Sequence, residues 1–128
     1  MGARRSSPGD GLHHGVGVLQ VKANPCESVD LERIGSQAHE RGVGVIGRQP
    51  FDRGAAFETP GLLSRLAEQE QRTPAQTLLR SALQRHGVDV VLVGMSTRVH
   101  LDENLRALAV PPLSADELQR LFAGTRIT

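Results

Sequence analysis

The 128-residue chain contains no tryptophan, no tyrosine and only three phenylalanines. Aromatic platforms on which nucleic-acid bases stack are therefore not expected, and the core must be built from Leu, Val, Ile and Ala. Its one cysteine, Cys26, cannot form an internal disulfide, which favours a reducing compartment, most simply the cytoplasm. No apolar run approaches the roughly 18 residues of a membrane span, and the first residues lack the apolar region of a secretory signal.

An excess of charge is also missing, because 15 Lys and Arg face 14 Asp and Glu, for a net charge of +1. This balance gives no electrostatic reason to expect binding to nucleic acid or to an anionic membrane. The length fits one domain. We expect residues 1–15, rich in Gly, Ser and Arg, to form a disordered tail and residues 16–128 to fold.

A short apolar pattern introduced by glycine occurs three times, at Gly15–Leu19, Gly42–Ile46 and Gly87–Val91. Runs of this type are typical of strands buried on both faces. The intervening and following segments carry apolar residues at helical spacing, which predicts helices near 28–42, 62–66, 73–87, 101–108 and 114–122.

Several of these helices have recognisable ends. Thr73 followed by Pro74 is an N-cap with proline at the first helical position, Gly42 and Gly87 are expected to end the helices before them, and Ser114–Glu117 forms a capping box. Strands that alternate with helices imply parallel strands joined by right-handed crossovers, hence an α/β fold.

Ligands of such sheets bind beyond the carboxyl ends of the strands. After the first strand, Gln20 and Asn24 offer amide groups, but Asn24-Pro25 reads more simply as a turn. After the second, Arg48 and Arg53 flank a loop that either holds a phosphate or is merely solvated. The residues themselves leave both interpretations of this loop open.

After the third strand, Gly94–Arg98 precedes a helix and forms either an anion site or an ordinary cap made by Ser96 or Thr97.

Outside these segments, simple structural roles account for the remaining candidate residues. Cys26 has no partner for metal or nucleophilic chemistry. His39 and His86 are expected near helix C-termini, where they suit the helix dipole. Glu68, Glu70 and Glu117 are interpreted as residues of solvated helix faces.

Four segments in order resemble the aldo-keto reductases. Gln20–Pro25 is similar to that family's Gln-x-x-x-Asn/His-Pro segment, and Gly42–Gly54 to its seventh strand and Ser-Pro-Leu-x-x-Gly loop. Thr73–Arg80 matches its Thr-x-Ala-Gln-x-Ala-Leu helix, and Val93–Leu105 resembles its eighth strand and closing Leu-x-x-Asn motif. The likeness covers residues 16–122.

The resemblance implies part of a (β/α)8 TIM barrel with three parallel strands and about five helices, from the carboxy-terminal side. In such a barrel the final helices, Leu101–Leu108 and Ala115–Phe122, are expected to pack on the outside of the strands. A whole barrel takes about 250 residues, so this chain supplies only the last three β/α units. The family's catalytic Asp, Tyr, Lys and His lie in earlier strands, and this sequence contains no tyrosine. The expected function is therefore that of a fragment of an NADPH-dependent carbonyl reductase, inactive alone, with NADP preferred over NAD.

The resemblance also implies cofactor contacts. Gln20 and Arg48 would meet the nicotinamide, Phe51 and Arg53 the pyrophosphate, and residues after the third strand the adenosine 2′-phosphate and adenine. The full set of expected cofactor-binding residues is Gln20, Arg48, Gln49, Phe51, Arg53, Met95, Ser96, Thr97, His100, Glu103 and Asn104. The alternative is a non-catalytic dinucleotide-binding or assembly module, whose open sheet edges pair with a complementing barrel half or with another copy.

Overall fold

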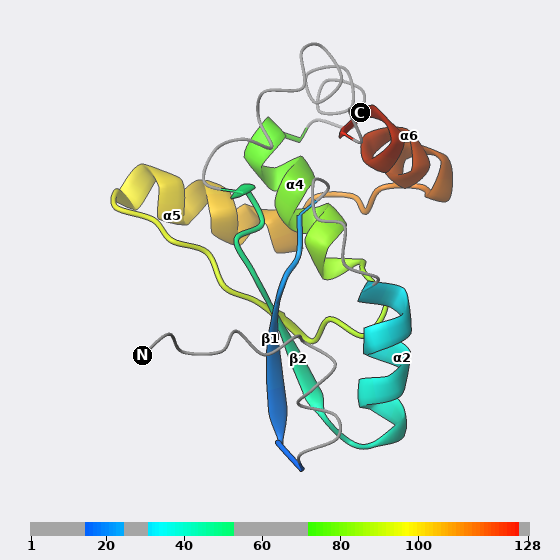
Figure 1. Cartoon of the computed structure of the whole chain (residues 1–128). Coiled ribbons are helices and arrows are strands. Elements are labelled where there is room, and N and C mark those ends of the chain that lie inside the picture. The colour runs from blue at the N-terminus through cyan, green and yellow to red at the C-terminus, as the bar shows by residue number, and fades with distance from the viewer. Residues whose placement is uncertain (1–14, 25–30, 53–71, 126–128) are drawn as a thin grey trace, which may run out of the picture.

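The computed structural model describes residues 15–24, 31–52 and 72–125. The predicted tail up to residue 14, the predicted helix near 62–66 and the candidate Arg53 lie outside these ranges. Strands and helices alternate as predicted (Figure 1). In chain order they are β1 (Val18–Lys22), α2 (Leu31–Glu40), β2 (Gly44–Arg48), α4 (Pro74–Leu83), β3 (Val90–Val91), α5 (Arg98–Leu105), the 3-10 helix η2 (Arg106–Leu108) and α6 (Ala115–Thr125).

The three strands form one parallel sheet in the order β1-β2-β3, which confirms the predicted topology. Gln20 lies opposite Ile46, and Ile46 lies opposite Val90. Each strand starts two or three residues later than predicted, because the introducing glycine belongs to the preceding turn. Gly42, for example, has a φ of 67° and donates its N–H to the carbonyl of His39 at 3.1 Å.

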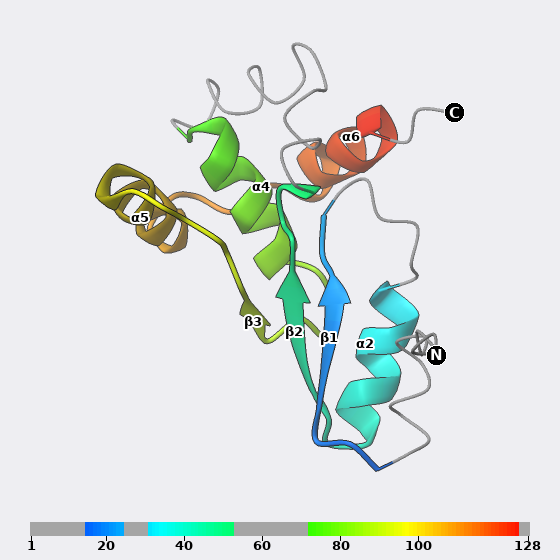
Figure 2. The same ribbon diagram turned by 60° about the vertical axis from the view of Figure 1, so that its left-hand side comes forward.

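Helix α2 covers one face of this sheet (Figure 2). Leu19 and Val21 of β1 are buried in a cluster with Leu31 and Ile34 of α2. Their neighbours alternate outward, and Val18 is 54% exposed. The prediction that the strands are buried on both faces is therefore wrong, because the described residues supply a helical layer on one face only.

The loop between α4 and β3 packs against α2 at a contact between two glycines. Gly87 has a φ of 84°, and a Cβ built on Gly35 would lie 2.2 Å from the carbonyl oxygen of His86. Only residues without side chains allow this approach. Beside it, the rings of His39 and His86 stack at 6.0 Å, and His39 Nε2 lies 3.6 Å from Asp89 Oδ1. The predicted helix that Gly87 should end already stops at Leu83.

A second core cluster joins α4 to α6. Leu78, Leu113 and Leu121 are buried together, with Leu118 and Phe51 packed against them. Figure 2 shows α6 beside α4 and beyond the upper ends of β1 and β2. The prediction that the final helices pack on the strands is therefore wrong for α6, which packs on helix α4.

A buried ion pair reinforces this cluster. Glu117 is only 7% exposed, and its Oε2 accepts a 2.7 Å hydrogen bond from Arg72 Nη2. The interpretation of Glu117 as a solvated residue is therefore wrong. The predicted capping box is confirmed, since Ser114 N donates to Glu117 Oε1 and Glu117 N donates to Ser114 Oγ. One carboxylate thus caps α6 and neutralises Arg72.

The predicted helix over 101–108 is present as α5 followed by η2, but it does not pack on the strands. Its leucines Leu101, Leu105 and Leu108 are 41%, 59% and 65% exposed, and α5 buries none of its residues. The stripe matches the helical period, yet no described element covers it. None of the described helices has the length and apolar composition needed to cross a membrane.

Candidate functional site

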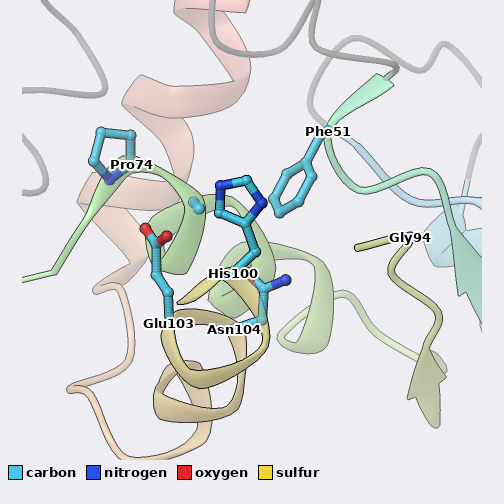
Figure 3. Close-up of a pocket in the computed structure, with 7 residues that line it drawn as sticks. Phe51, Pro74, Gly94, His100, Glu103 and Asn104 are labelled. Atoms are coloured by element: carbon cyan, nitrogen blue, oxygen red, sulfur yellow. The ribbon is translucent and has the colours of Figure 1, made fainter. Parts of the chain in front are cut away.

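A pocket of about 420 Å³ opens between the turn after β2, the start of α4 and helix α5. Figure 3 shows the rings of Phe51 and His100 facing each other across it, with Glu103 and Asn104 on α5 beside them. Its lining residues are Phe51, Pro74, Ala75, Gly94, His100, Glu103 and Asn104. Within the described part of the chain, no group of three His, Cys, Asp or Glu side chains is arranged to hold a metal.

The turn after β2 positions Phe51. Gln49 and Asp52 have φ values of 52° and 47°, in the left-handed region that non-glycine residues seldom adopt. The Gln49 carbonyl accepts hydrogen bonds from Asp52 N and from the buried Asn24 side chain, both at 3.0 Å. Asn24 thereby ties the end of β1 to the end of β2, and the tight turn places Phe51 between the pocket and the α4–α6 cluster.

The start of α5 is capped by Thr97. Its side chain accepts a 3.2 Å hydrogen bond from the N–H of His100. The capping interpretation of this segment is therefore confirmed for Thr97. The cap also fixes the first turn of the helix, which carries His100 on the pocket side (Figure 3).

Helix α5 is attached to α4 through Gln76. This side chain is 5% exposed, and its Nε2 donates a 2.9 Å hydrogen bond to the carbonyl of Glu103. Its Oε1 accepts from Thr73 N while Thr73 Oγ1 accepts from Gln76 N, which completes a capping box. Gln76 was missed as a residue that shapes the site. The available signal was the spacing Thr73-x-x-Gln76, which is that of a capping box.

The structure brings together four of the predicted residues, Phe51, His100, Glu103 and Asn104. The others lie elsewhere. Gln20 is exposed on the sheet face opposite α2, and Arg48 ends β2 in register with Lys22. Gln49 forms the turn, Ser96 and Thr97 lead into α5, and Met95 lines a separate apolar groove beside β3, while Arg53 lies outside the described residues.

Three lining residues were not among the predicted ones. Pro74 and Ala75 belong to the first turn of α4, and Gly94 follows β3. Pro74 was identified only as a helix start, and Gly94 only as part of the loop. Their participation depends on how α4 lies against α5, which no local pattern encodes.

The lining combines an apolar wall with polar side chains. Phe51, Pro74 and Ala75 provide an apolar wall, and Asn104, Glu103 and His100 provide donors and acceptors. A flat heterocycle with polar edges matches this combination. Among the described lining residues, none is a Ser, Thr, Cys or Lys nucleophile set beside a base.

Comparison with solved structures places this architecture among known barrels. The chain aligns with the thermostable aldo-keto reductase Tm1743, in complex with the inhibitor epalrestat, at 29% identity and a TM-score of 0.70, over 84% of this chain and 39% of that one. Aldose reductase from Giardia lamblia aligns at 18% identity and a TM-score of 0.73, over 89% and 39%. A mutant of Gox0644 in complex with NADPH aligns at 24% identity and a TM-score of 0.69, over 84% and 37%.

The chain therefore spans about 40% of the length of the structures it matches, and its three parallel strands with their helices correspond to part of a TIM barrel. No curated protein matches the sequence. A sequence profile of the Aldo/keto reductase family matches residues 14–123, nearly the whole chain. On this evidence, the chain belongs to the aldo/keto reductase family.

Proposed function

We propose that this chain is the carboxy-terminal, cofactor-binding part of an NADPH-dependent aldo-keto reductase, and that the pocket beside α5 receives the adenosine end of the cofactor. The observation that carries the proposal is that residues from two separate segments of the chain line the same cavity. Phe51 comes from the turn after β2 and His100, Glu103 and Asn104 come from α5, yet they line one cavity. The resemblance to the aldo-keto reductases assigns all four to cofactor binding.

The size and chemistry of the pocket suit a nucleoside. Its volume of about 420 Å³ falls in the range of about 300–1,000 Å³ that is usual for small-molecule sites. Phe51, which the resemblance assigns to the pyrophosphate, lines this pocket with an apolar ring, and we propose that adenine packs against that ring instead. Asn104 and Glu103 offer hydrogen-bonding partners for the polar edge of adenine. Ser96, Thr97 and His100, at the start of α5, would lie toward the 2′-phosphate, with Met95 preceding them.

The remaining predicted contacts belong to the other end of the cofactor. Gln20 and Arg48 lie on β1 and β2, on a face that no described helix covers, where the nicotinamide would be held. Gln49 and Arg53 would approach the pyrophosphate. Support for NADPH as the ligand comes from the Gox0644 mutant, whose structure contains it.

NADPH, when bound, supplies the hydride for carbonyl reduction. The residues of this chain would bind and orient it, but no tyrosine occurs in the sequence to donate the proton to the carbonyl oxygen. We therefore propose that the chain by itself binds the cofactor without turning over a carbonyl substrate. A cytoplasmic location remains part of the same proposal.

The test is a titration of the purified chain with NADPH, followed by cofactor fluorescence. We expect saturable binding, weakened about tenfold by His100→Ala and by Asn104→Ala, because each removes a polar contact to the cofactor. Val99→Ala is the matched control, since Val99 lies on α5, is 74% exposed and is not part of the pocket lining. Equal affinity in all four proteins would contradict the assignment of this pocket.

The second candidate is a non-catalytic dinucleotide-binding or assembly module. It is favoured by the same lack of tyrosine in the sequence. It is also favoured by the sheet, whose outer strands β1 and β3 each pair with β2 alone among the described residues. Reduction of a simple aldehyde by NADPH with the isolated chain would contradict both candidates. No NADPH binding, in a chain with a cooperative melting transition, would remove the reductase fragment and leave the assembly module.

A further inference from the structure

Two cations stand side by side where β1 and β2 end. Lys22 is the only lysine among the 15 Lys and Arg residues of the chain, and it is the last residue of β1. Its register partner is Arg48, the last residue of β2. Lys22 is exposed and Arg48 is partly buried. Register partners on neighbouring parallel strands lie about 4.8 Å apart, with their side chains on the same face.

These two cations lie on the face of the sheet that α2 leaves uncovered (Figure 2). Val21 and Gly47, the residues before them, are buried, and Val21 packs in the cluster with α2. Because side chains alternate along a strand, Lys22 and Arg48 belong to the opposite face. As the last residues of their strands they lie at the carboxyl rim, where ligands of parallel α/β sheets bind, rather than among the packed side chains of a barrel interior.

The backbone beneath the two cations is held in place. Ala23 N donates a 2.9 Å hydrogen bond to the carbonyl of Arg48. The Asn24 side chain, only 2% exposed, donates a 3.0 Å hydrogen bond to the carbonyl of Gln49. These two bonds tie the end of β1 to the end of β2, so the spacing between the two cations is set by the fold and only their side chains move.

Neither cation has a carboxylate partner within the described part of the chain. Three arginines elsewhere pair with Glu or Asp, but no ion pair involves Lys22 or Arg48. Asp52, the nearest described acidic residue along the chain, forms no ion pair with either. Like charges at register positions repel each other. With a net charge of only +1, the chain is not cationic in general, and this positive charge is local.

An oxyanion suits both side chains. The planar guanidinium of Arg48 can donate two parallel hydrogen bonds to a carboxylate or phosphate, and the ammonium of Lys22 supplies a mobile point charge with three donors. Gln20, two residues before Lys22 on the same face, adds an amide. Donors that converge from two fixed strands favour one compact anionic group.

We propose that Lys22 and Arg48 form an oxyanion subsite at the carboxyl ends of β1 and β2, and that it binds the carboxylate or phosphate of an anionic carbonyl substrate. The assignment of this anion to the substrate rests on the proposed function, in which the nicotinamide lies beside Arg48 and the carbonyl must approach it there. The preferred substrates are therefore carbonyl compounds that carry a negative group, rather than neutral aldehydes.

Titration of the full chain with inorganic phosphate, without cofactor, tests the subsite by nuclear magnetic resonance. The side-chain amine of Lys22 reports the contact directly, because no other lysine contributes a signal. We expect saturable shifts of this signal and of the backbone amides of Ala23 and Gln49. Lys22→Gln and Arg48→Gln, followed through those amides, should each weaken phosphate binding about tenfold, because each removes a charge-assisted hydrogen bond. Lys22→Arg, which keeps the charge, should retain most of the affinity.

Arg41→Gln is the matched control. Arg41 is exposed and precedes β2, so it removes the same charge at the other end of that strand. Equal weakening by this control, or shifts reproduced by sodium chloride at equal ionic strength, would mean general screening and would overturn the subsite. Acetate in a parallel titration distinguishes a carboxylate from a phosphate, and absence of binding by both anions would also overturn it. Circular dichroism checks that each variant folds.

The titration is then repeated with saturating NADPH to identify the source of the anion. Binding of phosphate or acetate that persists supports the substrate, whereas its loss would assign the subsite to the phosphates of the cofactor and overturn the substrate assignment. Anion binding by a chain that does not bind NADPH would leave the subsite and remove the proposed function. NADPH binding without anion binding would do the reverse.

Discussion

Helices α4 and α5 are neighbours joined by a hydrogen bond, yet they belong to opposite environments. Helix α4 buries six of its ten residues, including Leu78, which is fully inaccessible. Helix α5 buries none of its eight, and its Val99 is 74% exposed. The one helix is held by packing, and the other by its cap and by Gln76.

The buried helix α4 contributes mainly to the core, whereas the exposed helix α5 contributes most of the polar residues of the candidate site. The exposed helix α5 contributes His100, Glu103 and Asn104 to the pocket lining. The buried helix α4 contributes only Pro74 and Ala75, from its first turn. An exposed helix retains apolar surface that a ligand or a second copy can bury. The two helices should therefore respond differently to the same substitution.

The largest effect is expected from Leu78→Ala. Leu78 is at the centre of the α4–α6 cluster, so its truncation should lower the free energy of unfolding by about 3–5 kcal/mol through lost burial and a cavity. Urea unfolding followed by circular dichroism measures it. A loss below about 1 kcal/mol would show that this cluster contributes little to the fold.

The next effect concerns the ion pair beside α4. Burial raises the pKa of the Glu117 carboxyl, but the hydrogen bond from the Ser114 backbone, the Arg72 charge and the remaining side-chain hydrogen bonds outweigh burial, so the pKa lies below its usual value of 4.5. Because the folded pKa is lowered, the carboxylate stabilises the fold above the usual pKa. This contribution is lost as the pH falls through the folded value.

Glu117→Gln should therefore reduce stability by about 2–3 kcal/mol near neutral pH. The difference from the natural protein should shrink as the pH is lowered below about 4.5. Asp116→Asn is the matched control on the same helix, since Asp116 pairs with Arg120 at an exposed position and should change stability by less than about 0.5 kcal/mol. Melting temperatures of the natural protein and of both variants, measured from pH 7 to pH 3, test this prediction. If the difference between Glu117→Gln and the natural protein stays the same over this range, the ion pair does not contribute to stability.

A smaller and more local effect is expected from Gln76→Ala. It removes the hydrogen bond to the Glu103 carbonyl and half of the α4 capping box, which should cost about 1 kcal/mol. Amide hydrogen exchange should speed up through α5. Gln84→Ala is the control, because Gln84 makes a similar pair of 2.9 Å hydrogen bonds to the backbone of Leu113. Faster exchange of α5 in the Gln84 variant as well would contradict a specific link through Gln76.

The smallest effect is expected from Leu101→Ala, the α5 counterpart of Leu78→Ala. Leu101 is 41% exposed on a helix without buried residues, so the change in unfolding free energy should stay within about 0.5 kcal/mol. Urea unfolding beside Leu78→Ala gives the comparison directly. A loss as large as that of Leu78→Ala would mean that α5 is packed in solution against something that buries it.

Local patterns predicted much of the fold. Gly42 ends α2, Thr73 and Pro74 begin α4, and Ser114 with Glu117 caps α6, as their sequence positions indicated. These features depend on backbone conformation and on hydrogen bonds between residues three or four apart. The parallel order of the strands followed from the alternation with helices.

The candidate site was predicted less completely. The sequence identified Phe51, His100, Glu103 and Asn104 through resemblance, and the structure joins them in one pocket. It did not indicate that Pro74 completes the wall or that Gln76 holds α5 in place. The hydrogen bond from Gln76 to the Glu103 carbonyl, for example, joins residues 27 positions apart, across two helices whose crossing no local spacing specifies.

The sequence by itself determined the kinds of element, their order, their caps and the family to which the chain belongs, because each depends on short-range chemistry or on motifs read in order. Only the tertiary structure decided which apolar stripes are covered. Leu78 and Leu105 both follow a helical period, yet one is inaccessible and the other is 59% exposed. Burial requires a second surface at the right distance, and the arrangement of the whole chain, rather than the stripe itself, provides or withholds that surface.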